Sequence, residues 1–434
     1  MSECTLTKDD IKRIPFTLYD AGWVILCIGM AIGAGIVFLP IQIGIKGIWV
    51  FIVSIIIVYP GIYLLQDIYL KTLSRTEDAK DYTSIISQYL GPNWAIFMSI
   101  IYFLMLFKGI FNYSLAVTFD SASFLQTFGI TDGLMSDHFW WGLLVISVLV
   151  ALASQGEKLI FKISTPMVLV KLGIVLLIGI AMIPHWNFSN ISALPNMGSF
   201  IRDLFLTMPF TLFSILFMQI LSPVNIAYRK IESNRRIATY RAIRVNRIAY
   251  AILAISILFF AFSFTFTLNH EQAMLAYKQN ITALALAAKV LPGSLIKIMT
   301  VLLNIFAILT AFLGIYLGFQ DALKGIVRNI VSRFIPVEKI NERFLSVFVC
   351  AFSVISLWCL VMTRMSIILL NQLSAPLYGI VGCLIPGYLI YKVSLLHDLK
   401  GMAVYYIIGI GLMLCFSPLF ILFDKFLIST MKNK

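Results

Sequence analysis

Long apolar segments alternate with short polar ones along this chain, a pattern typical of a protein that crosses a membrane many times. A helix needs about 20 mostly apolar residues to cross a bilayer. Eleven segments reach or approach that length: 21–45, 47–70, 94–120, 138–154, 164–184, 203–227, 248–268, 296–322, 344–363, 366–391 and 402–429. We therefore predict an all-α polytopic membrane protein with eleven transmembrane helices.

The composition agrees, because 60% of the 434 residues are hydrophobic and only 12% are charged. Polar stretches are short, which predicts no separate soluble domain. We divide the chain into an N-terminal tail (1–20), two five-helix units (21–184 and 203–391) and an eleventh helix with the C-terminus (402–434). The first apolar segment has no small-residue cleavage pattern, so we expect it to remain in the mature protein.

The net charge of +13 is unevenly distributed. With the N-terminus placed in the cytoplasm, 22 of the 33 Lys and Arg residues fall on inside segments and nine on outside segments. This asymmetry predicts a cytoplasmic N-terminus and an external C-terminus. The basic polar stretch Arg229–Arg247 is then a topology signal that faces anionic membrane lipids, and we expect no nucleic-acid partner.

Enzymatic chemistry finds no support in the motifs. The sequence has no catalytic triad pattern, phosphate-binding loop or cluster with metal-ligand spacing. Its six cysteines contain no metal-like pair, and those in the apolar segments read as small core residues. We therefore predict no enzyme activity, no cofactor and no metal.

Small residues interrupt the first apolar segment within Gly29–Pro40. Each glycine lowers helix stability by roughly 1 kcal/mol relative to alanine. A helix break inside a membrane is tolerated mainly where it lines a cavity. Exposed N–H groups after the break suit a carboxylate, and carbonyls before it suit an amine, so Ile32, Gly33, Ala34 and Gly35 are candidate substrate-binding residues. The alternative is a small-residue packing face on an unbroken helix.

The sixth apolar segment carries a second candidate break. Pro209 and Pro223 bracket its middle, and Ser222 before Pro223 reads as an N-cap before a first-turn proline. Breaks in the first helix of each five-helix unit indicate an inverted repeat, with a ligand site near the membrane midplane. An ordinary proline kink is the alternative.

Side chains that select the substrate should come from the sixth and third segments. The candidates are Met218, Gln219 and Ser222 near the second break, and Tyr102 and Asn112 on the third segment. Polar groups at this depth usually face the bundle interior. Gln219 could equally bond to a neighbouring helix.

Several stretches together carry a family resemblance. The run Ala31–Pro40 resembles the first span of bacterial serine/threonine permeases of the hydroxy and aromatic amino acid permease family. Further similar stretches follow in family order: 183–187, 222–223, 261–263, 266–268, 278–281 and 314–318. The resemblance implies a 5+5 inverted repeat with an eleventh helix, residence in a bacterial inner membrane, and proton-coupled import of a small amino acid.

The chain also departs from that family. Relatives carry an amide or imidazole where this chain has Ile220, and Lys, Ser and His where it has Thr310, Ala311 and Ile315. These differences leave both the substrate and the coupling ion open.

Two lysines, Lys108 and Lys171, lie deep inside predicted spans. An amine in such a place can exchange a proton. Lys171 resembles a fifth-span lysine that reaches toward the contact between spans 1 and 8 in some proton-coupled members of the wider superfamily, so we assign it to ion coupling. Thr310, which replaces the relatives' lysine, is a second candidate. The alternative for Lys171 is snorkelling to the inner surface. Lys108 should line the cavity, either as the partner of an acidic substrate or as a structural donor.

The leading hypothesis is a secondary active transporter that imports a small, serine/threonine-like amino acid by proton symport. One alternative is an importer of a more acidic or carboxylate-bearing substrate. Another is a non-transporting amino-acid sensor on the same fold. The expected partners are the amino acid, protons and membrane lipids, and the oligomeric state stays open.

Overall fold

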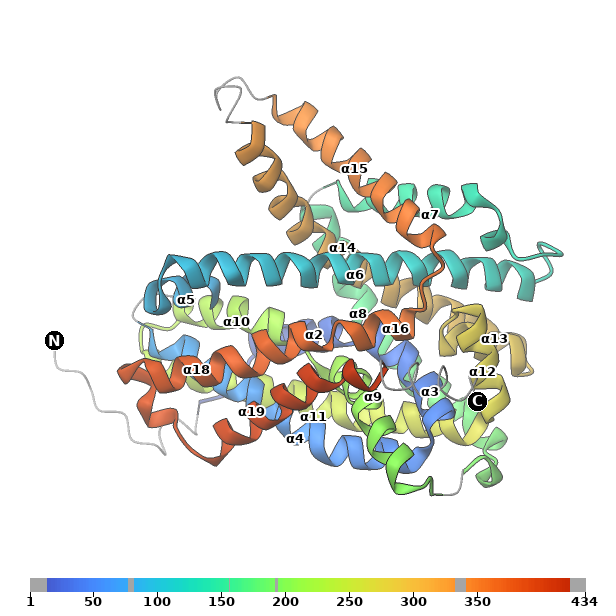
Figure 1. Ribbon diagram of the computed structural model, residues 1–434, viewed down its shortest axis with the longest axis horizontal. Helices are drawn as coiled ribbons and strands as arrows, with labels where there is room; N and C mark the ends of the chain where they lie inside the picture. Colours follow the sequence, from blue (N-terminus) through green and yellow to red (C-terminus); the bar gives the residue numbers. More distant parts are fainter. Residues whose placement is uncertain (1–13, 77–81, 156, 192–193, 332–340, 422–434) are drawn as a thin grey trace, which may run out of the picture.

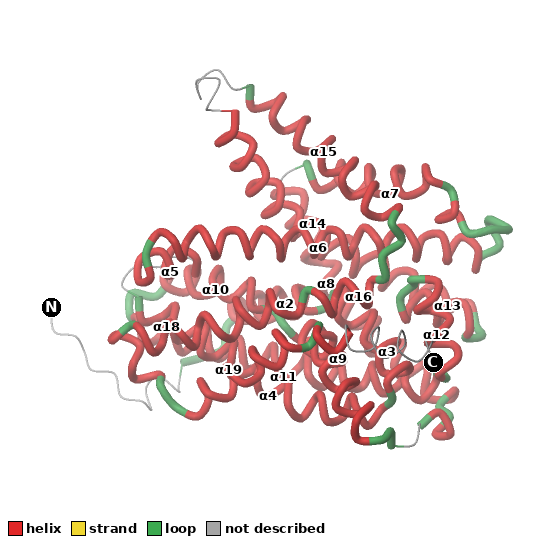
Figure 2. The backbone as a smooth tube through the Cα atoms, in the orientation of Figure 1, coloured by secondary structure: helices red, strands yellow, loops and turns green. Residues whose placement is uncertain are grey.

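A computed structural model describes residues 14–76, 82–155, 157–191, 194–331 and 341–421. Within these ranges the chain consists of helices and connecting loops, and no strand occurs (Figure 2). The predicted all-α class is confirmed.

The helices of the first half are α2 (Leu18–Ala31), α3 (Ala34–Lys46), α4 (Ile48–Arg75), α5 (Tyr82–Leu90), α6 (Pro92–Thr127), α7 (Phe139–Ala153) and α8 (Glu157–Met182). Those of the second half are α9 (Met197–Ile215), α10 (Met218–Ile231), α11 (Arg235–Thr267), α12 (His270–Gln279), α13 (Ala283–Val290), α14 (Ser294–Val331) and α15 (Glu342–Met362). The chain continues with α16 (Ile367–Leu373), α17 (Ala375–Tyr378), the π-helix η5 (Gly379–Leu384), α18 (Ile385–Lys392) and α19 (Met402–Phe416).

Ten of the eleven predicted spans have helices of sufficient length. Among the described residues, nine helices are long and apolar enough to cross a membrane. The pair α2 and α3, bent by 45° at its break, supplies a tenth span. The predicted span 138–154 corresponds to the apolar helix α7, which has 15 residues and is shorter than the other spans.

Helix α11 begins much earlier than its apolar segment. We expected a span from residue 248, preceded by a basic polar stretch, but the helix starts at Arg235. Arginine is a good helix former. The first turns of α11 therefore contain the basic residues of that stretch, and the apolar part of the helix follows them. Most of the stretch is therefore helical.

The packing pairs the two halves of the chain. Helices α3, α4, α9 and α11, from spans 1, 2, 6 and 7, pack on one another, while α6, α7, α14 and α15, from spans 3, 4, 8 and 9, form a second group (Figure 1). Equivalent helices of the two five-helix units thus lie together, as an inverted repeat requires. Helix α8 contacts α14, α11 and α2, and so joins the two groups.

Buried charge holds spans 1, 6 and 7 together near the N-terminus of α2. The Asp20 carboxylate is fully buried and accepts hydrogen bonds from Arg241 Nε and Nη2, both at 3.0 Å, and from the Tyr228 hydroxyl. Arg244 Nη2 lies 3.2 Å from the same carboxylate. This group of residues, which we call the Asp20 cluster, was not predicted from the sequence.

Candidate functional site

The first predicted break is present. Helix α2 ends at Ala31 and α3 begins at Ala34, with Ile32 and Gly33 between them. Gly33, the N-cap of α3, has no side chain to accept a hydrogen bond, so the first-turn N–H groups of α3 have no side-chain cap. The first span is therefore interrupted, and the alternative of an unbroken helix is wrong.

Gly33 and Gly35 both allow neighbouring helices to approach the backbone of the first span closely. A Cβ atom at Gly33 would lie 2.5 Å from the Tyr113 hydroxyl oxygen. At Gly35 it would lie 2.0 Å from the backbone carbonyl oxygen of Phe213. Gly33 thus brings the break next to a polar group of α6, while Gly35 lets α3 pack against the backbone of α9.

The second break lies earlier than we predicted. Helix α9 ends at Ile215 and α10 begins at Met218, so the expected start at Ser222 is wrong. The interruption lies at residues 216–217, well away from either proline, which also excludes a simple proline kink. Pro223 lies inside α10, where its missing N–H leaves the Gln219 carbonyl without a helical partner.

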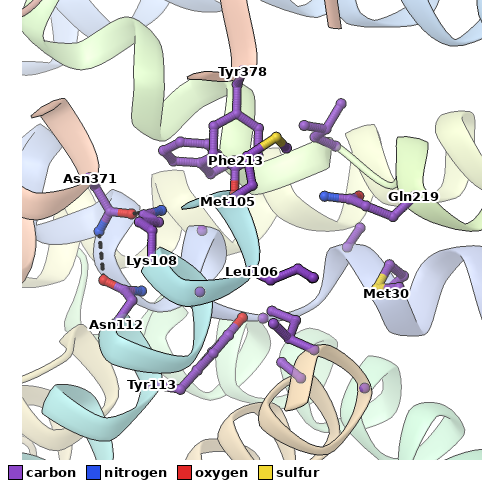
Figure 3. A pocket seen from close by; sticks show the side chains of 18 of the residues that line it. Met30, Met105, Leu106, Lys108, Asn112, Tyr113, Phe213, Gln219, Asn371 and Tyr378 are labelled. Carbon is purple, nitrogen blue, oxygen red and sulfur yellow. Dashed lines mark hydrogen bonds between the residues drawn. The ribbon is translucent and has the colours of Figure 1, made fainter. Parts of the chain in front are cut away.

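The two breaks border one cavity of about 150 Å³, shown in Figure 3. Six of the residues predicted for substrate binding or ion coupling line it: Gly33, Gly35, Tyr102, Lys108, Asn112 and Gln219. They come from spans 1, 3 and 6, so the fold brings together segments that are far apart in the sequence.

Other residues predicted for substrate binding do not line the cavity. Ile32 is almost fully buried, and Met218 packs close to Gly382 of span 10. Ser222 is buried, and its hydroxyl has no hydrogen-bond partner among the described residues. For Ala34, only the backbone position at the start of α3 is described.

Several lining residues were missed. Asn371 and Tyr378 belong to span 10, and Phe213 lies just before the second break. An amide inside an apolar span is a signal that could have singled out Asn371, because such groups usually face the bundle interior. The aromatic residues carry no comparable signal in a chain so rich in them.

Lys108 lies in a polar group with two amides. Its Nζ donates a hydrogen bond to Asn371 Oδ1 at 2.7 Å, and Asn371 Nδ2 donates to Asn112 Oδ1 at 3.2 Å. The amine also lies 4.1 Å from the ring centroid of Phe213 and 5.5 Å from that of Tyr378, within range of cation–π attraction. Figure 3 shows this group at one side of the cavity.

Lys171 is fully buried beside the first break and does not reach the surface, so the snorkelling alternative is wrong. Its Nζ donates hydrogen bonds to the carbonyl oxygens of Gly29, at 3.0 Å, and Ile32, at 2.9 Å. A third bond reaches Thr310 Oγ1 at 2.8 Å. The amine therefore connects spans 5, 1 and 8, and its role in ion coupling stays a prediction.

Comparisons with known proteins place the chain in a family. It is 48% identical to a probable serine transporter of Escherichia coli over 94% of this chain and 93% of the relative. It is 25% identical to the serine transporter SdaC of Escherichia coli, and 24% identical to the threonine/serine transporter TdcC of Yersinia enterocolitica, over 92% of this chain in each case and 93% and 94% of those relatives. No family model matches the sequence.

The fold is also known from a solved structure. A nucleobase-cation-symport-1 family transporter, in a closed conformation with bromovinylhydantoin bound, superposes with a TM-score of 0.54. The match covers 92% of this chain and 90% of that one at 12% identity, so it shows a common fold. The relatives and the broken first and sixth spans agree: this chain belongs to the serine/threonine permease branch of the hydroxy and aromatic amino acid permease family.

Proposed function

We propose that this protein is a secondary active transporter that imports a small, serine-like amino acid together with protons across a bacterial inner membrane. The names of the curated relatives support the substrate class, and the cavity between two broken helices supports a transported solute of small size. The observation that carries the proposal is the position of Lys171, whose amine joins the first break to span 8.

The breaks suit a zwitterion. In this proposal the substrate carboxylate binds the first-turn N–H groups of α3, from Gly33 to Gly35, where the helix dipole favours negative charge. The ammonium binds carbonyl oxygens at the ends of α2 and α9, together with that of Gln219, which Pro223 leaves without a helical partner. The side chains of Tyr102, Asn112 and Gln219 then surround the rest of the substrate.

Protonation of Lys171 would control the contact between the spans. An ammonium group has three N–H donors, which matches the three acceptors around Lys171. A neutral amine has two, and Thr310 Oγ1 already donates its own hydrogen to the Phe306 carbonyl at 2.7 Å. Loss of the proton therefore leaves one acceptor unpaired, which loosens the contact between spans 5, 1 and 8 and favours opening toward the cytoplasm.

Uptake into proteoliposomes tests the proposal. The purified protein is reconstituted, and accumulation of labelled serine is measured with the pH gradient and the sodium gradient varied independently. We expect accumulation with an inward proton gradient and no sodium. A requirement for sodium would contradict proton coupling and favour Thr310 as an ion ligand. Binding of serine without movement would contradict transport and support a sensor.

One observation favours a substrate with an additional carboxylate. Lys108 is buried, with only 8% of the residue exposed. No ion pair within the described part of the chain involves it. A buried cation without a counterion is costly, and an anionic substrate would supply the missing charge. Competition of labelled serine uptake by aspartate distinguishes this second candidate from the first.

A further inference from the structure

We propose that Lys108 is the residue that determines specificity, by donating a hydrogen bond to an oxygen atom on the substrate side chain. This inference rests on the proposed function, because it assumes that an amino acid occupies the cavity that Lys108 lines. The oxygen belongs to a hydroxyl or to a side-chain carboxylate, and both accept hydrogen bonds from an ammonium group.

The amine has donors to spare. An ammonium group carries three N–H bonds, and the only hydrogen bond that the described residues record for Lys108 Nζ is the one to Asn371 Oδ1. The second amide, Asn112, contacts Asn371 and thereby holds the acceptor in place. A polar donor aimed into a small cavity without a full set of partners favours a ligand that supplies an acceptor.

Aromatic rings hold the amine in place without using its donors. Phe213 and Tyr378 lie within cation–π distance of Nζ, at 4.1 and 5.5 Å from the ring centroids. Neither contact provides the negative charge that would neutralise the cation. The Lys108 amine therefore stays available to an oxygen atom that arrives with the substrate.

The position of Lys108 separates it from the proposed carboxylate site. The start of α3 supplies backbone donors for the α-carboxylate, whereas Lys108 belongs to α6 and bonds to span 10. Figure 3 shows Lys108 and Asn371 on one side of the cavity, and Gln219 and Met30 on the other. Lys108 is thus placed to bind a substrate group other than the α-carboxylate.

The test compares substrates that differ by one group. Serine, alanine and aspartate compete with labelled serine for uptake by the wild type, Lys108→Met and Lys108→Arg. Alanine lacks the side-chain oxygen, so the wild type should prefer serine or aspartate over alanine by on the order of ten- to a hundredfold, as expected for a hydrogen bond to a charged group. A preference for serine identifies a hydroxyl, and one for aspartate identifies a carboxylate.

In Lys108→Met, that preference should fall close to one while alanine still competes, and Lys108→Arg should retain part of it. An equal loss of all substrates in Lys108→Met, or an unchanged preference, would overturn the inference. If Lys108→Met does not fold, the stabilisation of the wild type against heat by serine and by alanine decides: equal stabilisation overturns the inference. Failure of the proposed function is different, because the wild type would then take up no labelled serine at all.

Discussion

At the first break, the absence of a side chain at Gly33 leaves room for the Tyr113 hydroxyl beside the cavity. A methyl group at Gly33 would come within 2.5 Å of the Tyr113 hydroxyl oxygen, which lies at the end of a side chain. We expect Gly33→Ala to be inserted and folded, because the tyrosine can move, but to bind substrate more weakly. Overpacking of this kind costs about 1–3 kcal/mol of folding stability, and movement of the tyrosine in the cavity should weaken serine binding by on the order of tenfold, or about 1.4 kcal/mol.

The double variant Gly33→Ala with Tyr113→Phe provides the control. Removal of the hydroxyl removes the overlapping atom, so affinity for labelled serine should recover in part. If Gly33→Ala binds serine as tightly as the wild type, the break does not border the substrate.

Gly35 behaves differently because its neighbour is backbone. A Cβ atom there would lie 2.0 Å from the Phe213 carbonyl oxygen, and a helix backbone cannot move aside as a side chain can. We expect Gly35→Ala to lower the melting temperature of the purified protein by several degrees, far more than Gly33→Ala does. Equal melting temperatures for the two variants would contradict the close packing of α3 against the backbone of α9.

The sequence predicted the elements that short stretches of residues specify. Apolar runs located the spans, and two glycines located the first break. The second break was misplaced because Ser222 before Pro223 is a strong helix-start pattern, whereas the actual start at Met218 follows residues with no such signal. Span 10 was predicted as one helix, but it contains a π-helix at Gly379–Leu384 that no local pattern indicated.

The Asp20 cluster could not be predicted, because Asp20 and Arg241 are separated by 221 residues and meet only through the packing of α2 against α11. Because the cluster is buried, its ion pairs should matter more for stability than exposed ones. Breaking a buried ion pair costs about 3–5 kcal/mol, whereas an exposed pair contributes about 0–1 kcal/mol. The cluster therefore stabilises the packing of spans 1, 6 and 7 at this end of the bundle.

We expect Asp20→Asn to open that end more often. Cys27, fully buried on α2, is a native reporter of such opening. In a background where the other cysteines are replaced by serine, a thiol reagent should label Cys27 faster in Asp20→Asn than in the parent protein. The control is Asp398→Asn, which removes an exposed ion pair with Arg75. Equal labelling rates in all three proteins would show that the cluster does not hold span 1 closed.

For the whole molecule, the arrangement of the spans follows from the family, but the orientation in the membrane rests on charge alone. We proposed a cytoplasmic N-terminus from the excess of Lys and Arg on alternate loops. With eleven spans, the C-terminus is then external. The first and last residues of the chain lie outside the described ranges, so the prediction concerns accessibility and not structure.

A cysteine introduced as Lys434→Cys tests this orientation. In a background in which the native cysteines are replaced, an impermeant thiol reagent should label it in cells whose inner membrane is intact. Labelling only after that membrane is disrupted would place the C-terminus inside and reverse the proposed topology.

The proposed coupling involves the whole molecule, because Lys171 joins three spans through three acceptors. The most direct test is accumulation of labelled serine in proteoliposomes driven only by a pH gradient, comparing Lys171→Ala with the wild type. The exposed Lys278→Ala on α12 serves as the matched control. We predict that Lys171→Ala loses accumulation but still binds serine, while Lys278→Ala accumulates it normally. Accumulation by Lys171→Ala at the wild-type level would contradict the proposed coupling role.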